Sequence, residues 1–505
     1  MSIAIRHERF LENHWQNRSL MLASVLIMIL MVTLVWGMAL NNLDDTLDML
    51  AKHSVSIKRY KQDPWLLITL GMVGSYVIGV FSIWLLIYKP PLFVSVWLFS
   101  LALAEARIPI LHEILLLTRY PLMLGLICFG LTALMLQKRT HKLSVQKMGL
   151  IVLSMVLAHL MFDRLELSEF LLMPMQLAVF LGIFYGLTFL IKTDEQLHAL
   201  CKAIAITGIL VTIINVLGWR FAEFPILQGR LRSWYMLPTG FANGYVLLLI
   251  TVLWLFINTT TFSLKILSLP ALLIGFVMIV ASGTRNAMLV FTLSTIIMCF
   301  FWKKRYFFFV VFVGSIFLAA MYFLDIGLSD ISRDSARLAK LSDKETRFRV
   351  WSLAWSFISE KPFWGYGLST NLINLSKNMP AWERFDTHNA YLGIWLRMGF
   401  IGLLGYVFIY ISALKAGFKL MRSRESNINA TKSIAVLFFS LLIALLVAGF
   451  FEENLSSRGS IQQALWAVCA ALLSGMKLER QKLATNNASR FYINQNHVKN
   501  KSLAY

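Results

Sequence analysis

Long apolar runs with almost no charged residues recur along the chain, separated by polar connections that are mostly short. A helix needs about 20 apolar residues to cross a bilayer, so each run predicts one transmembrane helix. The runs are Ser19–Leu40, Trp65–Tyr88, Pro91–Ala104, Tyr120–Leu136, Met148–Phe162, Phe170–Ile191, Ala203–Trp219, Pro238–Ile257, Ile266–Thr284, Asn286–Trp302, Tyr306–Leu324, Asn389–Leu414, Ser433–Phe451 and Gly459–Met476. The pattern predicts an all-α polytopic membrane protein with about 12 to 14 transmembrane helices. Pro91–Ala104 and Met148–Phe162 are short, so tilted or re-entrant segments are alternatives for these two runs.

The composition agrees with a membrane protein. Of the 505 residues, 14% are charged, whereas a soluble domain carries about 25%. The formal net charge of +21 would suggest nucleic acid as the partner of a soluble protein. Here the enrichment of Lys and Arg in cytoplasmic loops accounts for it, so no nucleic-acid partner is expected. No metal or cofactor is expected either, since the cysteines lie in or beside apolar runs at no metal-ligand spacing, which predicts core residues. They are Cys128, Cys201, Cys299 and Cys469.

Clusters of lysine and arginine indicate the orientation. With the N-terminus inside, every clear basic cluster except Lys58–Lys61 falls on one face, which predicts that both termini are cytoplasmic. The 325–388 segment, with short helices expected around Ser332–Ser342 and Thr346–Glu360, is too small for an independent enzyme domain. We therefore expect one long periplasmic loop that caps a site at the outer leaflet of a bacterial inner membrane. The expected regions are a cytoplasmic N-terminus (1–18), N-terminal transmembrane helices (19–219), central transmembrane helices (220–324), the periplasmic loop (325–388), C-terminal transmembrane helices (389–476) and a basic, disordered cytoplasmic tail (477–505).

Several arginines fall on the predicted periplasmic side, where the positive-inside rule disfavours them. Arg285 is the sharpest case, because it lies in a tight turn between two runs, and a charge at membrane depth often marks a functional site. The simpler interpretations are a snorkelling arginine at a helix end, solvated loop charges, or an interfacial helix. Taken together, the arginines indicate one anionic ligand, since guanidinium groups bind phosphate in a bidentate manner. The candidate ligands of a diphosphate are Arg230, Arg232, Arg285, Arg347 and Arg349.

His388 is the candidate general base, at the point where the long loop re-enters the membrane. A lone histidine is more often structural, but an imidazole beside several arginines can accept a proton near neutral pH. Glu452 and Glu453 lie on the same predicted side, before the last run, and are candidates to orient His388 or to bind an acceptor sugar. Trp351 is a candidate to stack on a sugar ring.

Four short motifs occur in order in the C-terminal half. They are Arg230 with Pro238, Thr284-Arg285-Asn286-Ala287, Arg347 and Trp351 with Pro362-x-x-Gly365-x-Gly367, and His388-Asn389 with Gly399 and Gly402. Together they resemble the O-antigen ligase and O-antigen polymerase superfamily of bacterial membrane glycosyltransferases. The first motif departs from the family at two positions, with Thr239 where Asn is usual and Ser233 where Gly is common. The resemblance extends from about Arg230 to Met476.

The resemblance implies a metal-independent, inverting glycosyltransferase that faces the periplasm. Its donor would be a glycan on undecaprenyl diphosphate, and its acceptor lipid A-core or a second lipid-linked glycan, with membrane lipid around it. Arg285 and His388 would be catalytic, and the other candidate arginines would hold the diphosphate. The expected activity is that of an O-antigen ligase in lipopolysaccharide biosynthesis. A polymerase of O-antigen or exopolysaccharide repeat units and a protein-glycosylating relative are the alternatives within the family.

A flippase or other transporter of lipid-linked oligosaccharides is the alternative from another class, because it also needs cations for a diphosphate. A transporter would line a path near the bilayer midplane with charge, often in repeated halves. Here the runs are nearly free of charge apart from Arg397, and no internal repeat is visible. The sequence therefore favours an enzyme, and it does not indicate an oligomeric state.

Overall fold

The structure, a computed structural model, describes residues 19–33, 64–103, 106, 108, 111–136, 154, 178–191, 193–222, 225–227, 230–235, 238–302, 342–368, 370–376, 386–422, 429–452 and 460–473. Its labelled elements are α3 (Pro64–Tyr88), α4 (Pro90–Leu103), α5 (Leu111–Leu136), the π-helix η2 (Ala178–Leu187), α8 (Thr188–Leu190), α9 (Asp194–Phe221), β1 (Ile226–Leu227), β2 (Arg230–Leu231), α10 (Pro238–Asn258), α11 (Phe262–Ala281), α12 (Arg285–Phe301), α16 (Ser342–Glu360), α17 (Leu372–Leu375), α18 (Ala390–Arg422) and α19 (Asn429–Gly449). Two further apolar helices cover Ser19–Thr33 and Ile461–Leu473.

This architecture confirms an all-α polytopic membrane protein. Within the described residues, 6 helices are long and apolar enough to cross a membrane, and shorter apolar helices accompany them. The predicted runs Met148–Phe162, apart from Ser154, and Tyr306–Leu324 lie outside the described residues, as does 325–341 of the predicted loop. The four cysteines are buried, which confirms the prediction that they are core residues.

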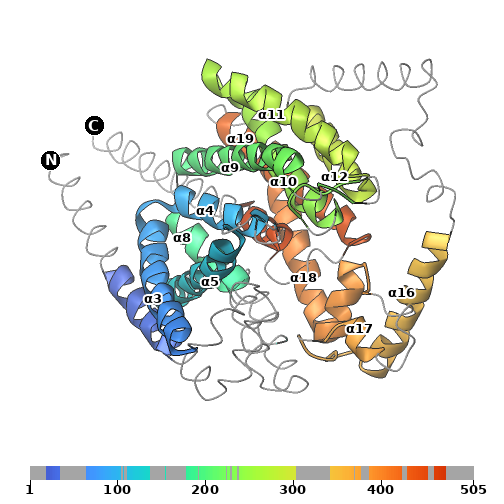
Figure 1. Cartoon of the computed structure of the whole chain (residues 1–505), viewed down its shortest axis with the longest axis horizontal. Coiled ribbons are helices and arrows are strands. Elements are labelled where there is room, and N and C mark those ends of the chain that lie inside the picture. Colours follow the sequence, from blue (N-terminus) through green and yellow to red (C-terminus); the bar gives the residue numbers. More distant parts are fainter. Residues whose placement is uncertain are drawn as a thin grey trace, which may run out of the picture.

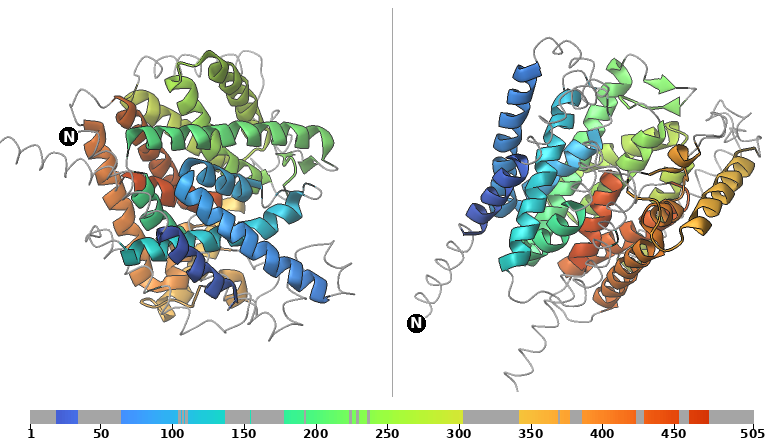
Figure 2. Two further views of the ribbon diagram at one scale, coloured as in Figure 1. Left: turned by 90° about the vertical axis from the view of Figure 1, so that its left-hand side faces the viewer. Right: turned by 90° about the horizontal axis from the view of Figure 1, so that it is seen from below.

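The helices form a bundle with α10 at its centre (Figure 1). Helix α10 packs against α9, α11, α12 and α19, and most of its side chains are buried. Helices α3, α4, α5 and η2 pack together on one side. Helices α16 and α17 lie at the opposite edge beside α18, away from α3 (Figures 1 and 2). This arrangement brings the loop helix α16 against the membrane helix that follows it in the chain.

Two helices begin earlier than the apolar runs predict. Helix α5 starts at Leu111, nine residues before the predicted run Tyr120–Leu136. Helix α9 starts at Asp194, nine residues before the run Ala203–Trp219, because Thr193 and Gln196 form a reciprocal capping box at its N-terminus. In both cases charged residues in the first turns end the uncharged run without ending the helix.

The predicted single span Asn389–Leu414 is wrong in one respect, because α18 breaks at Gly399. Gly399 has a φ of 67°, in the left-handed region, and divides α18 into two helices. The segment after α16 docks at this break: the Tyr366 N–H donates to the Leu396 carbonyl (2.8 Å), and the Gly367 N–H to the Arg397 carbonyl (3.0 Å). These bonds satisfy carbonyls that lose their partners where the first helix ends.

The glycines of this joint leave no room for a side chain. A Cβ at Gly365 would collide with the Arg397 backbone, and a Cβ at Gly399 would collide with the Phe363 backbone. The Trp395 indole N–H adds a bond to the Pro362 carbonyl (2.9 Å). The Pro-x-x-Gly-x-Gly motif is thus a docking segment that fixes α16 on α18.

Candidate active site

Glu452, just after α19, interacts electrostatically with several of the candidate site residues. Burial raises the pKa of its carboxyl. Four other groups lower this pKa. They are the positive charges of His388, Arg347 and Arg230, and a side-chain hydrogen bond with Asn243. These groups come from five separate parts of the chain, and we call them the Glu452 cluster. It consists of Arg230 on β2, Asn243 on α10, Arg347 on α16, His388 before α18, and Glu452.

Arg230 is held by the turn between α11 and α12. Its Nε donates to the Ser282 carbonyl (2.7 Å), and its Nη2 donates to the Thr284 hydroxyl (3.1 Å). Gly283 has a φ of 61° and lies against the Arg230 side chain, close enough that a Cβ would sit 3.1 Å from Nε. The predicted tight turn at Thr284-Arg285 is confirmed, since α11 ends at Ala281 and α12 begins at Arg285. Its role in this structure is to orient Arg230.

The β1–β2 hairpin that carries Arg230 was not predicted. Leu227 pairs with Arg230 in its antiparallel register. The hairpin is fixed to α9 by Trp234, whose indole N–H donates to the Ile214 carbonyl (3.1 Å), and by Ser233, whose hydroxyl donates to the Asn215 carbonyl (3.0 Å). Ser233 has a φ of 53°, which explains why glycine is common at this position of the motif.

Arg347 and Trp351 lie one turn apart on α16 and therefore share a face of that helix. The Trp351 indole N–H donates to the Thr387 carbonyl (3.0 Å). This bond places the turn that carries His388 beside the part of α16 that carries Arg347. The predicted helix Thr346–Glu360 is confirmed, with four more residues at its start.

His388 occupies a strained position at the start of α18. Its φ of 45° is unusual for a residue with a side chain, and its side chain is exposed. The next residue, Asn389, caps α18: its side-chain oxygen accepts from the N–H groups of Tyr391 (3.0 Å) and Leu392 (3.1 Å). The His-Asn pair thus joins a left-handed residue to a helix cap, and such strain is typical of functional sites.

Tyr391 connects this turn to Glu452. Its hydroxyl donates to the Leu446 carbonyl on α19 (2.7 Å), and its ring lies 4.7 Å, between centroids, from that of Phe450. Both contacts are near the end of α19, directly before Glu452. They hold the start of α18 and the end of α19 together, and so set the relation of His388 to Glu452.

Asn243 was not among the site residues predicted from the sequence. It is buried on α10, and the Nδ2 of Asn286, one residue after Arg285, donates to its side-chain oxygen (3.4 Å). Asn286 belongs to the second motif. The signal for Asn243 was an amide inside a long apolar run, where a buried polar side chain needs a partner.

The other predicted site residues are placed differently. Arg285 is the exposed first residue of α12 and directly follows Thr284, whose side-chain hydroxyl accepts a hydrogen bond from Arg230. Arg349 is exposed two positions from Arg347, on another side of α16, and Arg232 is half-buried after β2. Glu453 lies outside the described residues. The described part of the chain contains no group of three His, Cys, Asp or Glu side chains that could hold a metal ion.

Comparison with known proteins identifies a region that carries part of this site. Residues 270–407 match the family model described as O-antigen ligase. An O-antigen ligase of Salmonella typhimurium is 28% identical over 154 residues, which span 28% of this chain and 38% of that relative. The family match includes Arg347 and His388 of the Glu452 cluster, and Arg230 and Glu452 lie outside it. Through residues 270–407, this chain is similar to the O-antigen ligase family, and the aligned part spans 38% of the length of the Salmonella relative.

Proposed function

We propose that this protein is an O-antigen ligase of the bacterial inner membrane. It moves a glycan from undecaprenyl diphosphate to a sugar hydroxyl of lipid A-core on the periplasmic side, in lipopolysaccharide biosynthesis. The observation that carries the proposal is the Glu452 cluster, in which the charges of two guanidinium groups and an imidazole act on one buried carboxyl. The similarity of residues 270–407 to the O-antigen ligase family supports the proposal that this protein transfers a glycan.

The reaction is a displacement at the anomeric carbon. The acceptor hydroxyl oxygen forms the new bond, the bond between the anomeric carbon and the diphosphate oxygen breaks, and its electron pair leaves on the diphosphate. His388 takes the hydroxyl proton as general base. The attack comes from the face opposite the leaving group, so the configuration inverts.

Arg230 and Arg347 neutralise the charge that grows on the leaving diphosphate. Their guanidinium groups stay protonated in all conditions of interest, so no metal ion is needed for this role. Arg230 is oriented in advance by Ser282 and Thr284, which lowers the cost of ordering it when the donor binds. Arg285, exposed at the start of α12, is a further catalytic contact, and Arg232 and Arg349 are additional diphosphate ligands.

Glu452 orients His388 and balances the arginines before the donor arrives. The formal charges of Arg230, Arg347 and the ionised Glu452 carboxylate sum to +1, not counting the imidazole of His388. That remaining charge favours a diphosphate over a neutral ligand. The negative charge of Glu452 also stabilises His388 after it has accepted the proton. Trp351 is a positioning residue for His388, since its N–H donates to the Thr387 carbonyl.

A repeat-unit polymerase uses the same donor chemistry and remains the second candidate. A flippase would use charged side chains inside its membrane helices, and Arg397 is the charge that the sequence analysis found inside the predicted runs. Arg397 is buried and donates from Nε to the Thr370 carbonyl (2.9 Å). It therefore ties the docking segment to α18 instead of lining a path.

Deletion of the gene and complementation, followed by gel analysis of lipopolysaccharide, tests the function. A ligase predicts loss of all glycan chains on lipid A-core, whereas survival of single repeat units on the core would indicate a polymerase. Purified protein in detergent, given lipid-linked glycan and lipid A-core, separates enzyme from transporter. Transfer of the glycan without a sealed membrane supports the enzyme, and no transfer by folded protein would contradict it.

A further inference from the structure

A basic groove lies at the far end of α18 from His388. It is a hollow of about 690 Å³, lined by Leu414, Lys415, Phe418, Lys419, Arg422 and Phe439. The helix that follows Gly399 ends at Arg422, and at 1.5 Å per residue its 23 residues extend roughly 34 Å. The α18 residues that line the groove therefore lie roughly 22 to 34 Å along the helix from the break at Gly399, at the end of α18 opposite His388.

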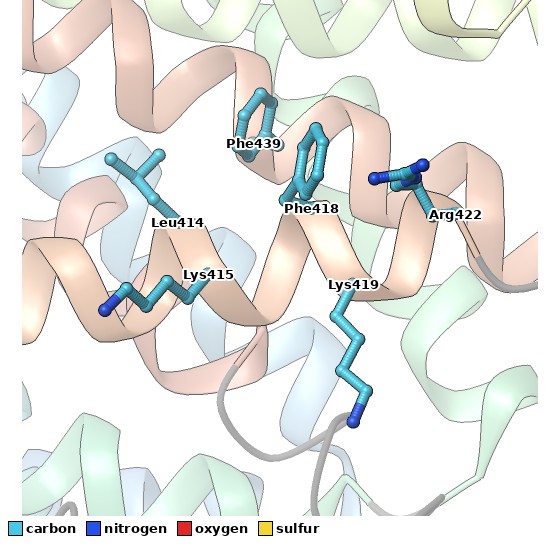
Figure 3. A pocket seen from close by; sticks show the side chains of 6 residues that line it. All are labelled: Leu414, Lys415, Phe418, Lys419, Arg422 and Phe439. Atoms are coloured by element: carbon cyan, nitrogen blue, oxygen red, sulfur yellow. The ribbon is translucent and has the colours of Figure 1, made fainter.

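The two sides of the groove differ in chemistry. Lys415, Lys419 and Arg422 are spaced by four and three positions, so they share one face of α18. Phe418 and Phe439 stand side by side and form an apolar floor, with Arg422 next to Phe418 and the lysines extending along another edge (Figure 3). The Arg422 guanidinium carbon lies 5.6 Å from the centre of the Phe418 ring, and among the described residues no acidic side chain lines the groove.

The floor exists because α18 and α19 approach closely at Gly417. A Cβ at Gly417 would lie 3.0 Å from Cδ2 of Phe439. Phe418 remains 45% exposed, so an aromatic ring faces outward among three cations at the end of a membrane helix. Cations in a last helical turn also stabilise the helix dipole, but this effect does not require an exposed aromatic floor.

We propose that the groove is a binding site for an anionic phospholipid of the leaflet opposite the active site. The cations hold the phosphate groups, and an acyl chain lies on Phe418 and Phe439. A basic pocket between membrane helices on the cytoplasmic side is the kind of site that binds lipids with several phosphates. Cardiolipin, with two phosphates, matches cations spread along one helical face and is the probe of choice.

Lipid retention by the purified full chain tests the site. Native mass spectrometry in detergent compares cardiolipin with phosphatidylcholine for the wild type, for Lys419→Gln/Arg422→Gln and for Lys202→Gln/Lys265→Gln. The control pair removes the same charge from α9 and α11, on the same predicted face. We expect the groove variant to bind cardiolipin roughly ten-fold more weakly, and the control pair to bind it like the wild type.

Equal loss in both double variants would mean a general attraction to positive charge and would overturn the site, as would unchanged binding in the groove variant. Circular dichroism and elution volume establish that each variant is folded. Should the groove pair fail to fold, Arg422→Gln alone and Phe418→Ala provide the same comparison. His388→Ala should retain cardiolipin fully, so this test is independent of the proposed reaction.

Discussion

The indole Nε1 of Trp351 donates a hydrogen bond to the main-chain carbonyl of Thr387 across 3.0 Å. This bond joins the loop helix α16 to the turn that carries His388, and Arg347 lies one turn earlier on the same helix face. Two motifs that are separate in the sequence are therefore one structural unit. The arginine and histidine of the proposed mechanism are positioned by the tryptophan between them.

Replacing Trp351 by Phe keeps the ring and removes the N–H. A neutral hydrogen bond contributes about 1 kcal/mol, so we expect glycan transfer to fall about five-fold while the amount of folded protein stays unchanged. Trp355→Phe is the matched control, because Trp355 is an exposed tryptophan on the same helix. An equal loss of transfer in both variants, measured with purified protein, would contradict a positioning role of Trp351.

The Gly399 joint allows a prediction about folding. Any side chain at Gly399 meets the Phe363 backbone, and its φ of 67° disfavours other residues. We expect Gly399→Ala to destabilise the protein by several kcal/mol and to reduce the monodisperse fraction in size-exclusion chromatography. Gly74→Ala on α3 is the control, since a Cβ there meets nothing within 4 Å. Normal yield and melting temperature for Gly399→Ala would show that the joint adapts.

The sequence alone allows prediction of local features of this fold and misses those that need distant partners. The turn at Thr284-Arg285 was predictable because two apolar runs meet at one charged residue. The break at Gly399 was not, because the apolar run continues through it and the segment that caps it lies some thirty residues earlier. The same limit applies to the site, where His388 and the arginines could be selected by predicted sidedness. Asn243 stands out in the sequence only as an amide inside an apolar run, and its connection to the site was not predictable because its partner Glu452 is more than 200 residues away.

Substitutions at Arg230, His388 and Arg285 should reduce glycan transfer without reducing the stability of the protein. Arg230→Lys keeps a positive charge but cannot donate to both the Ser282 carbonyl and the Thr284 hydroxyl in the same geometry. We expect transfer to fall about 100-fold in this variant, and His388→Ala and Arg285→Ala to abolish it, all with normal protein levels. Arg220→Ala, an exposed arginine at the end of α9, should transfer glycan at the wild-type rate. Full activity in any of the three site variants would remove that residue from the mechanism.

Glu452 makes activity and stability depend on pH in opposite ways. Because burial raises the pKa of Glu452, its carboxyl protonates at a higher pH than an ordinary glutamic acid, whose pKa is about 4.3. As the pH falls through this raised pKa, His388 loses its carboxylate partner, so we expect transfer to decline on the acid side. In Glu452→Gln, transfer should be low and this part of the pH profile flat.

The contribution of Glu452 to the free energy of unfolding changes with pH in the opposite direction to its effect on glycan transfer. A carboxyl with a pKa raised on folding contributes stability that is present below its unfolded pKa and is lost as the pH rises through the folded value. Glu452→Gln should therefore melt at the same or a higher temperature than the wild type at neutral pH, although it transfers less glycan. The exposed Glu195 on α9 provides the control Glu195→Gln, for which both measurements should match the wild type. A Glu452→Gln variant that melts at a clearly lower temperature would show that the ionised carboxylate holds the fold together, and its loss of transfer would then carry no information about His388.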